Sequence, residues 1–360
     1  MLNPPVNRLA YLDALRGIAA MSVCVYHAVG SIGVNGMAAT SLPDEIKNVV
    51  MNGFDLGRFG VVLFFLISGF IIPASLKPGQ TLLRFVVTRF FRLYPAYWLA
   101  CFLILFLPIS VHTASHEIIN VLANLTMVPR LFHEPELSGV FWTLFVEILF
   151  YFTCASLFKL GLLEKPVIVG LVAICLNLAV PLAILCNTFF YTKLPLLFLC
   201  HHLSFLFVGS VLRLDLLKGD RQARIFSILL LVLTLVTVPV ITGLLFPVPQ
   251  IVASRFVMYS AGATTAAYYL AIASFLLVTW NRAIISSLFL HLGKVSYSLY
   301  LLHMLCITGV VSLLSPSTLG GMVLHVMLSL TLSLLAANAA YHLVEKPAMV
   351  LGRRIVQTYK

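Results

Sequence analysis

The chain has few charged residues for its length. Asp, Glu, Lys and Arg make up 10% of its 360 residues, whereas a soluble domain carries about 25%. Hydrophobic residues make up 61%, and the mean hydropathy is +1.05. A soluble protein of this size could not bury so much apolar surface. The composition therefore excludes a soluble protein and predicts an all-α, polytopic membrane helix bundle.

Acidic residues are scarce beside basic ones, with 12 Asp and Glu against 23 Lys and Arg and a formal net charge of +11. In a soluble protein this excess would suggest a nucleic-acid partner. In a membrane protein, Lys and Arg concentrate in cytoplasmic loops and set the orientation of the spans. We therefore interpret the charge as a topology signal, and we expect membrane lipids and no nucleic acid as partners.

The sequence also lacks a pattern typical of a metal site. Its seven cysteines lie within apolar runs, without paired metal-ligand spacing, so we interpret them as small hydrophobic residues. His201 and His202 open one apolar run, and we expect one of them to meet the membrane interface. Because no third ligand lies close to them in the sequence, we expect no metal ion.

Long apolar runs dominate the rest of the chain. Ten of them reach the roughly 18 residues that a membrane-spanning helix needs. They cover about 9–30, 57–76, 90–109, 141–159, 166–186, 194–213, 225–246, 260–280, 290–314 and 322–344. With a cytoplasmic N-terminus, the loops place most of the 23 Lys and Arg inside. The positive-inside rule thus predicts that both termini are cytoplasmic.

We find no internal repeat, low-complexity tract or soluble domain in the sequence. We predict one integral membrane domain over residues 1–350 and a short basic cytoplasmic tail over 351–360. The first apolar run carries Arg16 and is too long for a cleavable signal peptide, so we expect it to stay in place as the first span.

Two polar residues, Arg16 and His27, stand in that first span. Eleven residues make three helical turns plus about 20°, so both lie on one face, about 16 Å apart along the axis. Such a polar stripe is costly against lipid, so the face should line the bundle interior or an aqueous cavity. Arg16 has an alternative, in which it snorkels to the inner interface and pairs with Asp13. For His27, which has no carboxylate nearby in the sequence, a functional role is favoured.

Glu147 is a further polar residue deep in an apolar run, FWTLFVEILFY. It lies about 9 Å inward from Phe141, in the outer half of its span and at a depth similar to that of His27. A carboxylate that accepts one imidazole N–H fixes the tautomer and makes the other nitrogen more basic. We therefore predict a catalytic His27–Glu147 pair. A structural ion pair or a protonated Glu147 is the alternative.

Arginines cluster at the start of the third run, in RFVVTRFFRLYPAYW. Arg89 and Arg92 stand at positions i and i+3 and are therefore neighbours on a helix surface. Two guanidinium groups at the cytoplasmic side suit the phosphates of a ligand, which arginine binds in bidentate fashion. Topology alone also places arginines here, and the spacing does not decide between the two interpretations.

The ninth run contains a polar stripe in KVSYSLYLLHML. Ser296, Tyr300 and His303 fall at positions i, i+4 and i+7 of one helix face. We expect Tyr300, His303 and Ser68 to line the same cavity. Hydrogen bonds between helices are the alternative, and they are favoured for Ser296.

Together these residues resemble the acyltransferase-3 family of integral membrane acyltransferases, over nearly the whole chain. The segments that carry the resemblance are YLDALRGIAAMSVCVYH, GRFGVVLFFLISGFII, RFFRLYPAYW, WTLFVEILFY, SYSLYLLH and the EKP at 345–347. The arginine–ten residues–histidine pattern of the family falls on Arg16 and His27. Its arginine pair falls on Arg89 and Arg92, and its membrane glutamate falls on Glu147.

The resemblance implies an O-acyltransferase that moves an acetyl or longer acyl group onto a carbohydrate hydroxyl. The donor would be a cytoplasmic acyl-CoA, used as a substrate and not as a bound cofactor. The acceptor would be a polysaccharide, an O-antigen or a lipid-linked glycan, and the location a bacterial inner membrane. The family's double-carboxylate form of the glutamate motif is absent, because Val146 precedes Glu147 and Ile148 follows it. Because the chain ends soon after the tenth run, it looks like a stand-alone member.

The resemblance also implies roles for the polar residues. Arg89 and Arg92 would hold the CoA phosphates, and the pantetheine arm would carry the thioester past Arg16 toward His27. His27 would act as the general base, oriented by Glu147. Arg16 would pair with a cofactor phosphate or stabilise the thioester oxyanion. Direct transfer and an acyl-histidine intermediate both remain open.

A transporter or flippase of a lipid-linked glycan is the alternative function, because polar residues in a bundle also suit a translocation path. Transporters often show repeat symmetry, which this sequence lacks. A non-catalytic sensor of the same fold would tend to lose the charged residues, and here they are all present. The oligomeric state does not follow from the sequence.

Overall fold

The computed structural model describes residues 10–34, 53–77, 79–107, 117–185, 190–245, 260–281, 286–314 and 318–358. These residues form helices, turns and short connections, with no strand among them. The predicted all-α class is confirmed.

Ten long helices make up most of the described part of the chain. They are α1 (Ala10–Val34), α4 (Leu56–Ile71), α5 (Leu82–Phe106), α7 (Trp142–Lys159), α8 (Pro166–Leu185), α9 (Phe190–Lys218), α10 (Arg221–Leu245), α12 (Ala261–Asn281), α13 (Ser287–Leu313) and α14 (Leu319–Ala340). Ten segments of the described residues are long and apolar enough to cross a membrane. The prediction of ten spans is confirmed, and the protein is a multi-pass integral membrane protein.

Shorter helical pieces connect or extend the long ones. They are η1 (Pro73–Ser75), α6 (Ile118–Leu125), η2 (Pro129–Phe132), η3 (Tyr341–Glu345) and α15 (Lys346–Thr358). The tenth span continues from α14 through η3, a π-helical turn, into α15. Helix α15 therefore includes most of the predicted tail. It packs against α5, where Gly352 lies so close to Phe91 that an added Cβ would come within 2.7 Å of that side chain.

The third span begins earlier than the hydropathy of the sequence indicates. We expected it to start near residue 90, and helix α5 starts at Leu82, with Thr81 as its N-cap. The arginines between residues 84 and 92 lower the hydropathy of this stretch. They remain helical because Arg89 and Arg92 face the protein interior and not lipid.

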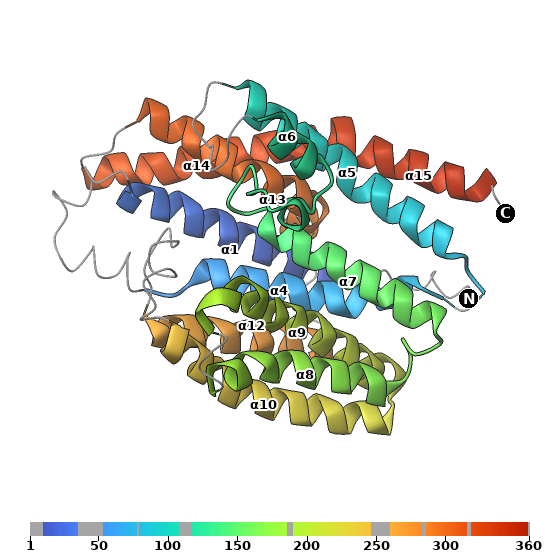
Figure 1. Cartoon of the computed structure of the whole chain (residues 1–360). Helices are drawn as coiled ribbons and strands as arrows, with labels where there is room; N and C mark the ends of the chain where they lie inside the picture. Colours follow the sequence, from blue (N-terminus) through green and yellow to red (C-terminus); the bar gives the residue numbers. More distant parts are fainter. Residues whose placement is uncertain are drawn as a thin grey trace.

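The helices follow one another across the molecule in the order α14, α13, α1, α4, α9, α8 and α10 (Figure 1). Helix α12 packs on α4 and α10, and α7 contacts α4 and α9. Helix α1 is thus central, with α13 on one side and α4 on the other. These neighbours decide which side chains can meet Arg16 and His27.

Helices α1 and α13 cross at two glycines close to Arg16. A Cβ added to Gly17 would lie 2.7 Å from the carbonyl oxygen of Phe289. A Cβ added to Gly293 would overlap the backbone of Asp13. Only hydrogen fits between the two backbones, so glycine permits the close approach. The crossing brings the polar face of α13 next to that of α1.

The connection between α5 and α7 is held by aromatic side chains of the RFFRLYPAYW segment. Tyr97, Trp98 and Tyr94 donate hydrogen bonds of 2.8–3.0 Å to backbone carbonyls of residues 124–126, at the end of α6. Helix C-termini leave such carbonyls without intrahelical partners. The aromatic residues satisfy them and so fix the chain that leads into α7, which carries Glu147.

Candidate functional site

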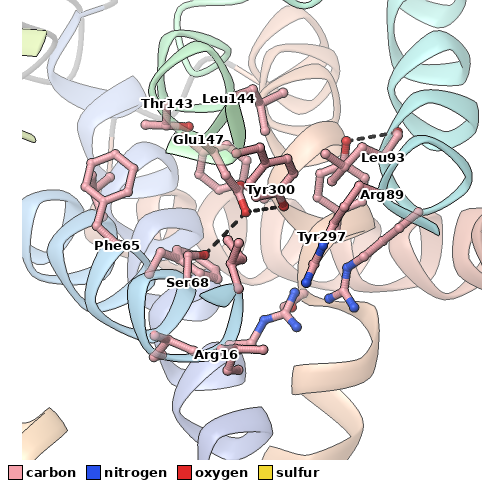
Figure 2. Close-up of a pocket in the computed structure, with 18 residues that line it drawn as sticks. Arg16, Phe65, Ser68, Arg89, Leu93, Thr143, Leu144, Glu147, Tyr297 and Tyr300 are labelled. Atoms are coloured by element: carbon pink, nitrogen blue, oxygen red, sulfur yellow. Dashed lines mark hydrogen bonds between the residues drawn. The ribbon is translucent and has the colours of Figure 1, made fainter. Parts of the chain in front are cut away.

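A cavity lies where α1, α4, α5, α7 and α13 meet. Its empty volume is about 770 Å³, its open mouth included. The polar residues that line it include Arg16, Ser68, Arg89 and Glu147, which Figure 2 labels, and also Arg92 and Tyr151. The wall thus carries three guanidinium groups and one carboxylate, so an anion is the favoured occupant.

Arg89 is held in place from two directions. One of its terminal nitrogens donates a hydrogen bond of 3.1 Å to the hydroxyl oxygen of Ser75. Its guanidinium carbon lies 5.6 Å from the ring centre of Phe85 and 5.3 Å from that of Tyr151. These cation–π distances keep the charge oriented without neutralising it. Figure 2 shows Arg16 and Arg89 reaching into the same space.

Arg16 lies among other charged groups. It interacts electrostatically with Arg92 and with the carboxylates of Asp13, Glu147 and Glu345. It also lines the cavity, so the interaction with Asp13 and a place in the cavity wall occur together. The arginines of α1 and α5 therefore belong to one cluster, although they are far apart in the sequence.

Glu147 is fixed at the opposite wall of the cavity. Its Oε1 accepts a hydrogen bond of 2.7 Å from the hydroxyl of Tyr151 and a longer one of 3.4 Å from that of Ser68. Both hydroxyls belong to residues that line the cavity. The carboxylate therefore faces the same space as the arginines and is oriented by side chains of α4 and α7.

Tyr300 lines the cavity and is held rigidly. Its hydroxyl donates to the carbonyl of Val140 at 2.8 Å and lies 2.7 Å from the hydroxyl oxygen of Thr143. Ser296 also lines the cavity, but we expected it to bond across helices. It instead donates to the carbonyl of Gly293 on its own helix, because a serine hydroxyl reaches the preceding turn.

His27 and His303 lie together beyond Tyr300. Their ring centres are 5.2 Å apart, and the rings of Tyr300 and His303 are 5.8 Å apart. His303 is buried, whereas His27 is partly exposed as a residue, with its Nδ1 atom buried. We expected His303 to line the cavity. It is three residues past Tyr300 in the sequence, and its ring instead lies next to that of His27. The described residues that line the cavity include Glu147 but neither histidine.

His201 and His202 do not meet the interface as expected. They are 1% and 2% exposed. His202 Nε2 accepts a hydrogen bond of 2.7 Å from Arg58, and His201 Nε2 lies 3.2 Å from the hydroxyl of Tyr268. Partners on α4 and α12 compensate their burial, and sequence spacing could not reveal these partners. Among the described residues, no group of His, Cys, Asp and Glu is arranged to hold a metal ion.

The sequence did not lead us to predict three further residues of the site. Tyr151 and Ser75 orient Glu147 and Arg89, respectively. Glu345 is 2% exposed, accepts a 2.6 Å hydrogen bond from Ser298, and interacts electrostatically with Arg16 and Arg92. The i, i+4 spacing of Glu147 and Tyr151 was a readable signal. The EKP segment, which contains Glu345, was a second readable signal, but in the sequence it contributed only to the family resemblance.

Comparison with known families agrees with this arrangement. Residues 9–341 match a family model described as an acyltransferase domain. The chain belongs to this acyltransferase family. Its polar clusters on α1, α5 and α7 all lie within the matched region, which confirms the resemblance seen in the sequence motifs.

One curated protein that is similar to this chain is the exopolysaccharide production protein ExoZ of Rhizobium meliloti (strain 1021). The two are 36% identical over 132 residues, which cover 33% of this chain and 40% of ExoZ. The match thus spans less than half the length of that relative. No solved structure matches the chain.

Proposed function

We propose that the protein is a membrane O-acyltransferase that moves an acyl group, most simply acetyl, from a cytoplasmic acyl-CoA to a carbohydrate hydroxyl. The observation that carries this proposal is the cavity with three arginines and one glutamate in a chain of the acyltransferase family. Acyl-CoA is an anion with several phosphates, and arginine binds phosphate oxygens through paired N–H donors.

In this proposal the arginines bind the donor. Arg89 and Arg92 hold the phosphates at the cytoplasmic mouth, and Arg16 adds a third positive charge further in. Arg16 and His27 are separated by about 16 Å along α1. The extended pantetheine arm of CoA covers this separation and brings the thioester past Tyr300 to His27. The phosphates then never need to leave the arginines.

His27 acts as the general base. It takes the proton of the acceptor hydroxyl, while the hydroxyl oxygen forms a bond to the acyl carbon. The carbon–sulfur bond breaks, and CoA leaves as a thiolate that takes the proton from the imidazolium. The predicted pair of His27 and Glu147 stays a prediction, because the Oε1 atom of Glu147 accepts hydrogen bonds from Tyr151 and Ser68.

The acceptor is a hydroxyl of an extracytoplasmic or lipid-linked carbohydrate. Two points support it. The relative ExoZ is named for exopolysaccharide production, and His27 lies about 16 Å from Arg16 along α1, away from the proposed donor phosphates. A bacterial inner membrane, with both termini in the cytoplasm, places the donor and acceptor on the sides that this proposal requires.

The test follows the release of free CoA from radiolabelled acetyl-CoA by purified protein in detergent, with and without a crude glycan extract. We expect release that rises with the extract and is lost in His27→Ala, while the variant still binds acetyl-CoA. If folded wild-type protein neither binds acyl-CoA nor releases CoA from acetyl or longer donors, the acyltransferase proposal is wrong. The transporter or flippase alternative then takes its place.

A further inference from the structure

The hydrogen bonds of His303 fix which of its ring nitrogens carries the proton. Its Nδ1 lies 2.8 Å from the carbonyl oxygen of Tyr300 and 3.2 Å from that of Leu299. A carbonyl oxygen can only accept a hydrogen bond, so Nδ1 must be the donor. In the neutral imidazole, Nε2 then carries the lone pair and is a base.

This Nε2 atom is an acceptor in the protein interior. His303 is 1% exposed, and Nε2 has no hydrogen-bond partner among the described residues. Buried polar atoms in folded proteins nearly always have a partner, so an acceptor left open calls for an explanation. The backbone of α13 fixes the orientation of the ring, because both carbonyls belong to the preceding turn of the same helix.

The ring of His303 lies next to that of His27 on α1. The two ring centres are 5.2 Å apart, and the planes are tilted by 43°. A ring nitrogen lies about 1.2 Å from its ring centre, so two nitrogens that face each other over this separation come within hydrogen-bond distance. A rotation of the His27 ring can therefore bring one of its N–H groups to Nε2 of His303.

We propose that His303 is a positioning residue for the acyl transfer: its Nε2 accepts an N–H of His27, so that the other nitrogen of His27 faces the acceptor hydroxyl. The inference rests on the proposed function. It assigns to His303 the orienting contact that the sequence suggested for Glu147, whose carboxylate is bonded to Tyr151 and Ser68. When His27 takes the hydroxyl proton, its imidazolium is stabilised by the same hydrogen bond.

Two amide replacements test the roles of the two ring nitrogens of His303 one at a time. The amide nitrogen of Asn reaches the position of Nδ1, so His303→Asn keeps the bond to the Tyr300 carbonyl and loses the acceptor at Nε2. The amide oxygen of Gln reaches the position of Nε2, so His303→Gln keeps an acceptor for His27. Both variants remove the imidazole. Because Asn is smaller than Gln and leaves more empty space at this buried position, the thermal unfolding midpoint of each variant is measured beside its activity.

The experiment measures kcat and KM for acetyl-CoA in both variants and in the wild type, with acetyl-CoA binding measured separately. We expect kcat to fall about 100-fold in His303→Asn, within the range that general-base catalysis contributes. His303→Gln should recover at least a tenth of the wild-type kcat, and KM should stay unchanged in both. Full kcat in His303→Asn, or equal losses in both variants, overturns the inference.

Failure of the proposed function is a different outcome, because then the wild type itself neither binds acetyl-CoA nor turns it over. If the variants do not fold, ¹⁵N NMR of histidine-labelled wild type and His27→Ala decides the question. We expect a protonated Nδ1 for His303, and an Nε2 resonance that shifts when His27 is replaced. An Nε2 that is protonated, or that does not respond to the replacement, overturns the inference.

Discussion

At the scale of single residues, the cavity is defined by an imbalance of charge. Its wall carries the guanidinium groups of Arg16, Arg89 and Arg92 and the carboxylate of Glu147. Partly buried charges of one sign repel one another unless an opposite charge joins them. Glu345 lies near two of the arginines and offsets part of the excess. The remainder favours a ligand with several negative charges.

The charge imbalance predicts the effect of removing two arginines. Arg89→Ala combined with Arg92→Ala should raise KM for acetyl-CoA about 100-fold, because hydrogen bonds to charged groups contribute about 1.5–3 kcal/mol each. The measurement is steady-state kinetics at saturating acceptor, and kcat should change much less than KM. Arg84→Ala is the matched control, since Arg84 is on the same helix but is not among the cavity-lining residues. The donor-binding role is refuted by an unchanged KM, or by an equal rise in the control.

Residue spacing predicted part of this site. The neighbouring positions of Arg89 and Arg92, and the common face of Arg16 and His27, followed from helix geometry alone. The direct partners did not, because they come from other helices. Ser68 reaches Glu147 from α4, and His303 reaches His27 from α13. Helix periodicity fixes the face of a residue but does not reveal which helix packs against it.

At the scale of helices, close packing decides the geometry of the site. The spans were predictable because long apolar runs have few alternatives in lipid. The α1–α13 crossing was not, since Gly17 and Gly293 are unremarkable glycines until the two backbones are seen together. The start of α5 was misplaced for a related reason: its arginines look like a loop by hydropathy but face the cavity.

The crossing predicts a local loss of stability. Gly17→Ala should lower the thermal unfolding midpoint of the protein in detergent, because the new methyl group would lie 2.7–2.8 Å from backbone atoms of α13. Overpacking of this kind costs about 1–3 kcal/mol. Gly243→Ala in α10 is the control, since nothing lies within 4 Å of the added carbon, and alanine favours helix. An unfolding midpoint that falls equally in both variants, or in neither, would show that the α1–α13 approach is not tight.

At the scale of the whole molecule, the account requires a donor on one side of the membrane and an acceptor on the other. The ten spans bring α1, α5 and α13 together so that the arginines lie toward one end of α1 and His27 toward the other. The sequence predicted this polarity from the positive-inside rule and from the positions of Arg16 and His27 in the first span. It could not place the cavity, which depends on the order in which the helices pack.

The central claim is tested most directly in vesicles that contain the protein in a single orientation. Radiolabelled acetyl-CoA is supplied on the side of the arginines, and the carbohydrate acceptor is enclosed on the opposite side. We predict that the enclosed carbohydrate becomes labelled and that free CoA appears only on the arginine side. If label is transferred only when donor and acceptor share one side, or if intact carbohydrate crosses the membrane without label, the account is contradicted.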